Sequence, residues 1–121
     1  MKSSKVAPEH VPKPWGHETI WARSDRYVGK ILHVRAGESL SLQYHERKDE
    51  TMRVLVGTLE LEVGDAGAAR RTVRLGPGDA WHIPPGTRHR RRALVDTDIL
   101  EVSTPELDDV IRLEDRYGRV K

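Results

Sequence analysis

Two short stretches of this sequence concentrate side chains that are able to bind a metal ion. In the first stretch, Gln43 and His45 are separated by one residue, and Glu50 follows after a short polar link. Because successive side chains of a β-strand point to opposite faces, Gln43 and His45 would point the same way. A hairpin-like return of the chain would then bring the Glu50 carboxylate beside the imidazole of His45. The pattern predicts ligands on neighbouring strands.

The second stretch, residues 78–89, supplies a further imidazole. A Pro84-Pro85-Gly86 turn precedes a strand-like run that starts near His89, so this strand could present His89 as a fourth ligand. The sequence contains no cysteine, which excludes disulfides and thiolate sites and leaves histidine, carboxylate and amide groups as metal ligands. We expect the other histidines to be surface or hydrogen-bonded groups, namely His10, His17, His33 and His82.

The elements that must position these ligands are short strands. Runs that are β-branched or alternate in polarity cover residues 27–34, 39–44, 52–56, 58–63, 72–75, 80–83, 88–94 and 99–102. Glycine and proline turn signals lie between the runs. Many short strands at even spacing predict an all-β chain that forms a closed barrel or a sandwich.

The two ends of the chain have a different character. Pro8, Pro12 and Pro14 predict an extended arm over residues 1–14, because proline fixes φ and lacks an N–H donor. We place a single domain in residues 15–121, since a chain of 121 residues has room for one core. In residues 106–117 apolar side chains recur at roughly helical spacing, which predicts a short C-terminal helix or an ordered tail.

Composition excludes several classes of function. The sequence is 36% apolar and 33% charged with a formal net charge of +2, as in a globular domain with a solvated exterior. No run of 18 apolar residues and no signal peptide are present, so we expect a cytoplasmic protein with no membrane contact. The arginine run at residues 88–92 lacks interleaved aromatic residues, and no phosphate-binding glycine loop precedes a helix. Nucleic-acid and nucleotide binding therefore have no support.

Both ligand-bearing stretches resemble the motifs of the cupin superfamily. The first motif is a glycine, five residues, His-x-His, a glutamate and a later glycine; the second is G-x5-P-x-G-x2-H. Gln43 stands where most metal-binding cupins have the first histidine, and Ala93 replaces an asparagine that often closes the second motif. The resemblance implies a jelly-roll barrel that holds one divalent metal ion. Zinc is the expected ion, with manganese, cobalt, nickel or iron as alternatives, and the implied ligands are Gln43, His45, Glu50 and His89.

A narrower resemblance accounts for the glutamine. Residues 13–16, 30–31, 40–45, 83–86 and 113–119 are similar to the cupin domain of type II phosphomannose isomerases. That domain, often fused to a sugar nucleotidyltransferase, interconverts mannose 6-phosphate and fructose 6-phosphate with a divalent metal. Arg47, Thr51 and Met52 replace the family's His, His and Trp, and Ser103 replaces a usual glutamine. The implied partner is a small phosphorylated sugar.

Isomerisation moves a proton between C1 and C2 of the sugar while charge builds on its oxygens, so it requires a general base. The candidates are Lys48, which matches an arginine of the family, and Glu101 on a late strand. As a residue of the loop between the ligand-bearing strands, Lys48 would change stability by only about ±0.5 kcal/mol when removed.

Four further cations are candidates for substrate binding. Lys30 and Arg112 could balance the phosphate charge. Arg88 and Arg90 would flank the barrel mouth and bind phosphate through two hydrogen bonds, or would instead lie on a solvated strand face.

Two other classes of function stay open. A non-catalytic cupin that senses or binds a sugar or another acidic metabolite agrees with the departures at Arg47, Thr51 and Met52. Another metal-dependent cupin enzyme, such as an epimerase or a dioxygenase, is the third possibility. We also expect a homodimer, because small antiparallel barrels with extended arms often pair through sheet edges.

Overall fold

The computed structural model describes residues 2–65 and 68–120, so residues 1, 66, 67 and 121 of the predicted arm and domain lie outside the described part. All elements in the described part are β-strands. The described residues contain no helix that is long and apolar enough to cross a membrane. The strands are β1 (Glu9–Lys13), β2 (Gly16–Arg23), β3 (Val28–Val34), β4 (Leu42–Tyr44), β5 (Glu50–Val56), β6 (Leu59–Gly64), β7 (Arg71–Leu75), β8 (Ala80–Ile83), β9 (Arg88–Ala93), β10 (Thr97–Ser103) and β11 (Ile111–Glu114).

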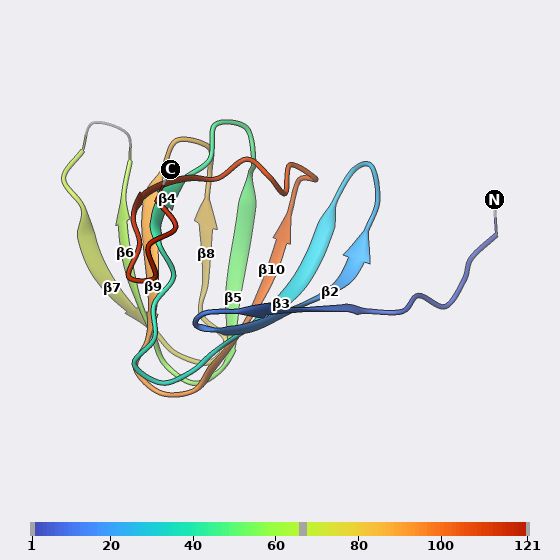
Figure 1. The fold of residues 1–121 in the computed structure, drawn as a ribbon, viewed down its shortest axis with the longest axis horizontal. Helices are drawn as coiled ribbons and strands as arrows, with labels where there is room; N and C mark the ends of the chain where they lie inside the picture. The colour runs from blue at the N-terminus through green and yellow to red at the C-terminus, as the bar shows by residue number, and fades with distance from the viewer. Residues whose placement is uncertain (1, 66–67, 121) are drawn as a thin grey trace.

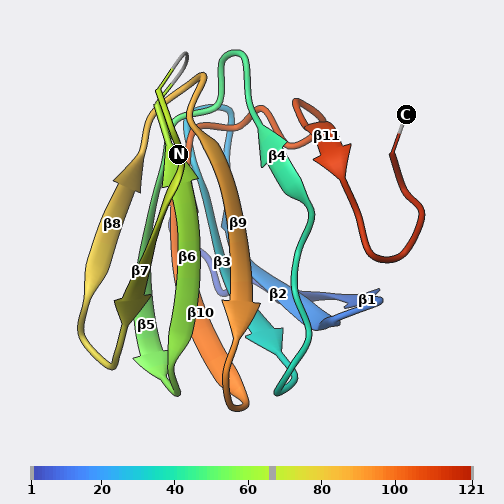
Figure 2. The ribbon, with the colours of Figure 1, turned by 90° about the vertical axis from the view of Figure 1, so that its left-hand side faces the viewer.

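The strands form two antiparallel sheets that face each other (Figures 1 and 2). One sheet has six strands in the order β1-β2-β3-β10-β5-β8, and the other has five in the order β11-β4-β9-β6-β7. Strands distant in sequence are neighbours, since β10 lies between β3 and β5 and β9 lies between β4 and β6. These crossovers confirm the predicted all-β jelly roll.

Inward-facing side chains change from apolar to polar along individual strands. On β5 the buried residues are Glu50, Met52 and Val54, in that order, because alternate residues share a face. On β9 the inward row runs from His89 to Ala93. The apolar part of these rows joins the core between the sheets. The polar residues of the same rows, Glu50 on β5 and His89 and Arg91 on β9, follow directly on the apolar residues. The packed core therefore fixes the positions of these polar side chains.

Every strand-like run predicted from the sequence overlaps a strand of the structure. The helical alternative for residues 106–117 is wrong, because Ile111–Glu114 form β11, and the rest of the segment is turns and irregular chain. The strand β11 pairs with β4 and so provides backbone partners at a sheet edge. These partners override the helical spacing of the apolar residues. The segment is therefore the ordered tail that was the other alternative.

Part of the predicted arm is also a strand. Residues Glu9–Lys13 are extended, as the prolines indicate, and pair with β2 in an antiparallel hairpin. The strand β1 lies at the edge of its sheet, where the missing N–H of Pro12 is tolerated. Residues 2–8 have no regular structure and extend away from the barrel (Figure 1).

The turn between β5 and β6 requires glycine at position 57. Gly57 has a φ of 96°, and a Cβ added there would lie 2.5 Å from the carbonyl oxygen of Asp96. Gly37 has a φ of 82° but would meet nothing within 4 Å. Both Gly57→Ala and Gly37→Ala carry the left-handed strain, but only Gly57→Ala also displaces backbone. We expect Gly57→Ala to lower the free energy of unfolding by at least about 1 kcal/mol more than Gly37→Ala does, as measured in urea titrations. Equal losses would contradict this reading of the turn.

Candidate metal centre

Three predicted ligands meet inside the barrel. His45 follows β4, Glu50 begins β5 and His89 lies on β9, and all three side chains are buried. One ligand atom from each lies within 4.8 Å of the others. Oε1 of Glu50 is 3.1 Å from Nε2 of His45 and 3.2 Å from Nε2 of His89. Two imidazoles and a carboxylate therefore converge on one point.

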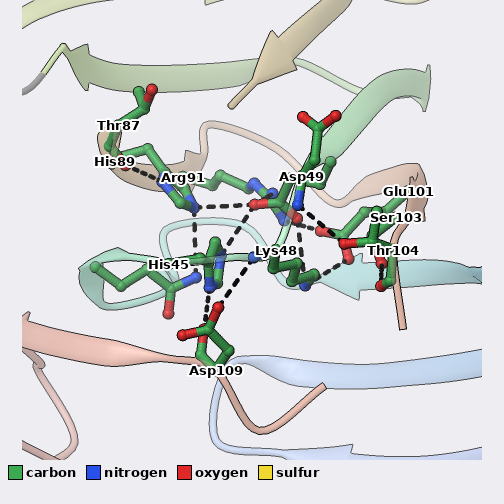
Figure 3. A network of polar contacts seen from close by, with 12 residues as sticks. His45, Lys48, Asp49, Thr87, His89, Arg91, Glu101, Ser103, Thr104 and Asp109 are labelled. Atoms are coloured by element: carbon green, nitrogen blue, oxygen red, sulfur yellow. Dashed lines mark hydrogen bonds and ion pairs between the residues drawn. The ribbon is translucent and has the colours of Figure 1, made fainter. Parts of the chain in front are cut away.

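The other nitrogen of each ring faces a backbone carbonyl. Nδ1 of His45 lies 2.5 Å from the carbonyl oxygen of Asp109, and Nδ1 of His89 lies 3.0 Å from that of Thr87 (Figure 3). A carbonyl oxygen only accepts hydrogen bonds, so each Nδ1 carries a proton. In the neutral form of the two rings, each Nε2 lone pair would then point at the Glu50 carboxylate oxygen, and these lone pairs repel one another unless a cation lies between them. This donor arrangement fits a metal ion.

Gln43 lies beside this cluster. It is the direct cross-strand partner of His89, and Nε2 of its amide is 3.5 Å from Nε2 of His89. Its Oε1 accepts a hydrogen bond of 2.9 Å from the Ser41 hydroxyl. A rotation of the amide by 180° would turn Oε1 towards the histidines, and amide orientation is assigned from hydrogen bonds rather than observed directly. The side chain is thus in place to complete a four-residue ligand set.

Glu50 has the electrostatic character of a ligand. Burial would raise the pKa of its carboxyl group, but nearby cations, first Arg91, hold that pKa well below its usual value. Its Oε2 is buried and has no hydrogen-bond partner among the described residues. An ionised carboxylate with two imidazoles and an amide suits a divalent ion such as zinc, whose usual partners are nitrogen and oxygen donors. The residues present therefore fit the implied metal.

Arg91 is a central residue that the sequence analysis did not assign to the site. Its buried guanidinium lies 3.3 Å from Oε1 of Glu50 and 2.9 Å from Oε1 of Glu101. The period-two alternation that directs His89 inward also directs residue 91 inward, so the signal was present on β9. A fully buried arginine with two carboxylate partners fixes the positions of both acids.

The two candidates for the general base form an ion pair. Nζ of Lys48 lies 3.4 Å from Oε2 of Glu101 and 3.4 Å from Oε2 of Glu50. Burial lowers the pKa of Lys48, but the carboxylates of Glu101 and Glu50 outweigh burial and raise it. Lys48 is only 4% exposed, so the small change in stability expected for removal of a loop lysine does not fit its position. Its removal would leave two buried carboxylates with one cation fewer.

A cavity of about 300 Å³ adjoins the cluster. Gln43, His45, Lys48 and Glu101 line it, as do the predicted substrate-binding residues Lys30 and Arg112. Lys30 is paired with Glu18 and Glu101 at 3.2 and 3.6 Å. Burial and then the charge of Arg119 lower the pKa of Arg112. The structure thus brings Lys30 and Arg112 to the same space as the proposed ligands.

Arg88 and Arg90 do not line this cavity. Arg88 stacks over the ring of Tyr44, with 3.9 Å between its Cζ and the ring centroid. Arg90 is 2.8 Å from Glu62 and lines a larger groove of about 660 Å³, to which the three clustered ligands do not contribute. The proposed ligands Gln43 and His45 line the smaller cavity, so metal-binding chemistry rather than volume distinguishes it. A substrate role for Arg88 or Arg90 stays a prediction.

The four remaining histidines lie outside the cluster. His33 and His82 contact Asp98 and Asp49 at 2.6 and 2.7 Å. His10 is hydrogen-bonded to Thr19, and His17 stacks on His33. Each therefore has a partner other than the proposed metal.

Both the sequence and the fold are similar to those of known proteins. A family model described as a cupin domain matches residues 30–103. The mannose-1-phosphate guanylyltransferase of Escherichia coli K12 is 36% identical over 116 residues, which cover 91% of this chain and 23% of that protein. The mannose-1-phosphate guanylyltransferase ManC of Salmonella typhimurium is 35% identical over 115 residues, with the same two coverages. The chain thus spans less than a quarter of the length of these relatives.

Among solved structures, KdgF from a Halomonas species is similar over most of both chains. The TM-score is 0.70 and the sequence identity is 28%, and the match covers 86% of this chain and 92% of KdgF. The similarity therefore extends to the whole architecture of a chain of comparable length.

Proposed function

The chain belongs to the cupin domain family, and from this premise we propose that it is a metal-dependent isomerase that interconverts mannose 6-phosphate and fructose 6-phosphate. The observation that carries the proposal is the buried cluster of His45, Glu50 and His89 beside a cavity that Lys48 and Glu101 also line. A volume of about 300 Å³ lies at the lower end of small-molecule sites. The names of the guanylyltransferase relatives, which contain mannose 1-phosphate, support a substrate of the same class.

In this proposal Gln43, His45, Glu50 and His89 hold one divalent metal. Such an ion, when bound, supplies Lewis acidity that polarises the carbonyl and hydroxyl oxygens of a sugar. The carbonyls of Asp109 and Thr87 hold the two imidazole rings in the orientation that binding requires. Arg91 holds Glu50 as a carboxylate, because its guanidinium lies against the same oxygen that faces the rings.

Glu101 is assigned as the general base. Its carboxylate borders the cavity and is held by Arg91 at 2.9 Å and Lys48 at 3.4 Å. In the forward reaction it takes the proton from C2 of the aldose and returns that proton to C1. Nζ of Lys48 gives a proton to O1 and recovers one from the O2 hydroxyl group, so the carbonyl moves from C1 to C2. Lys48 is paired with two carboxylates as an ammonium group, so it donates hydrogen bonds to the sugar oxygens on which negative charge builds.

Glu101→Gln tests this assignment because it keeps the shape and removes the base. We expect the kcat for mannose 6-phosphate isomerisation to fall by about 100-fold, with metal content unchanged. The matched control is Glu60→Gln on β6, which lines the outer groove and should keep full activity. The readout is fructose 6-phosphate formation by the metal-loaded protein.

Two results would refute parts of the proposal. Full activity of Glu101→Gln would remove Glu101 as the base. A wild-type protein that binds mannose 6-phosphate without forming product would refute the isomerase and favour the non-catalytic binding alternative.

A further inference from the structure

Arg112 lies on the face of β11 that is turned towards the proposed metal ligands. The register of β11 on β4 places Arg112 directly opposite Gln43. Side chains of directly opposed residues in an antiparallel pair project from the same face, with their Cβ atoms about 4.5–5.5 Å apart. Both side chains line the cavity that His45 also lines. The C-terminal tail therefore contributes a guanidinium to the metal-binding cavity.

Arg112 differs from the other cations of this cavity, because it has no carboxylate partner in the part of the chain that the structure describes. The others all lie within 4.0 Å of an acid; they are Lys13, Arg23, Lys30, Lys48, Arg91 and Arg119. Within residues 2–65 and 68–120, Arg112 forms no ion pair, and its buried Nε has no hydrogen-bond partner. Arg112 is half-buried, and partial removal of an unpaired cation from water is unfavourable, so an anion in the cavity would be attracted to Arg112 in preference to the paired cations.

The neighbouring acid does not compensate Arg112. Asp115 accepts hydrogen bonds from the backbone N–H, Nε and Nη2 of Arg119, at 2.7, 2.9 and 3.1 Å. Burial and then the charge of Arg119 lower the pKa of Arg112, and the charge of Asp115 raises it by less than these two causes lower it. The missing partner at this end of the cavity is thus an anion that residues 2–65 and 68–120 do not supply.

We propose that Arg112 is the anchor for the phosphate group of the substrate and determines that the site selects phosphorylated over neutral sugars. This inference rests on the proposed function, because it assigns a subsite of the same cavity. A guanidinium pairs with phosphate through two parallel hydrogen bonds, a geometry that a lysine ammonium does not provide. Lys48 and Arg91 are occupied with Glu50 and Glu101, so they orient the acids and leave the phosphate to Arg112.

The test compares Arg112→Gln and Arg112→Lys with the wild-type protein, all loaded with metal. Arg74→Gln is the control, since it removes one positive charge from an exposed position of β7. Calorimetric titrations use mannose 6-phosphate, mannose, glucuronate and inorganic phosphate as probes. We expect Arg112→Gln to weaken binding of mannose 6-phosphate and of inorganic phosphate by at least about tenfold, with metal content and mannose affinity unchanged. Arg112→Lys should lose less, and Arg74→Gln should lose nothing.

Several outcomes would overturn the assignment. These are equal phosphate affinity in Arg112→Gln and wild type, an equal loss in Arg74→Gln, or a wild-type protein that binds neither phosphate probe. A wild-type preference for glucuronate that depends on Arg112 would replace phosphate by carboxylate and overturn the phosphate assignment. Arg112-dependent phosphate binding without turnover would support the anchor and refute the isomerase. Isomerisation with an unchanged KM in Arg112→Gln and Arg112→Lys would support the isomerase and refute the anchor.

Discussion

Arg91→Met is expected to lower the free energy of unfolding by about 3–5 kcal/mol, the cost of leaving a buried charge without its partner. The guanidinium of Arg91 is 2% exposed and lies between Glu50 and Glu101, at 3.3 and 2.9 Å. Methionine fills similar space but removes the cation that lies between the two carboxylates. Glu50 would then keep the ion pair with Lys48 at 3.4 Å, and Glu101 would keep Lys48 at 3.4 Å and Lys30 at 3.6 Å. The measurement is urea-induced unfolding with a chelator present, because bound metal would itself add stability.

The neighbouring arginine provides the control. Arg92 faces outward and is exposed, so Arg92→Met should change stability by no more than about 0.5 kcal/mol. Adding Glu101→Gln to Arg91→Met removes one of the two stranded charges and should recover part of the loss. Equal stability of Arg91→Met and Arg92→Met would show that the buried charge network does not hold the site together.

Alternation along the strands explains both what the sequence predicted and what was missed. Alternate residues of a strand share a face, which places Gln43 and His45 together and also places His89 and Arg91 together. A run of arginines, however, is typical of a solvated strand face, and the sequence alone does not show that β9 is buried on one side. Only the opposing carboxylates of Glu50 and Glu101 make the inward position tolerable for Arg91. Those partners lie on other strands, so no local pattern reveals them.

Strands β2 and β11 were missed for related reasons. On β2 a buried position is occupied by Glu18, whose charge is balanced by Lys13 and Lys30, so the apolar alternation is interrupted. The strand β11 exists through its pairing with β4, a contact between segments far apart in sequence. The spacing of the apolar residues predicted a helix because local sequence does not show that a sheet edge is available for pairing.

The predicted homodimer stays a prediction.

His89→Ala is expected to weaken metal binding more than about 100-fold. Loss of groups that merely orient a ligand already costs about 10–100-fold, and His89 supplies a ligand atom itself. The ring of His89 is buried, its Nδ1 is held by the Thr87 carbonyl, and its Nε2 faces Glu50 at 3.2 Å. Alanine removes this nitrogen and also leaves the amide of Gln43 without its neighbour. His45 and Glu50 alone would then remain from the converging group.

His82→Ala is the matched control for a lost histidine. His82 is exposed and contacts Asp49 at 2.7 Å, outside the cluster. Its removal should therefore leave metal affinity and stoichiometry unchanged. Comparison of the two variants separates loss of a ligand from a general effect of removing an imidazole.

The decisive experiment for the metal centre is a zinc titration of the metal-stripped wild-type protein, His89→Ala and His82→Ala, with stoichiometry from elemental analysis. We predict one ion per chain for the wild type and for His82→Ala, and an affinity lower by more than about 100-fold for His89→Ala. Equal affinities in the two variants, or a wild-type protein that retains no zinc, manganese, cobalt, nickel or iron, would contradict a metal centre built from Gln43, His45, Glu50 and His89.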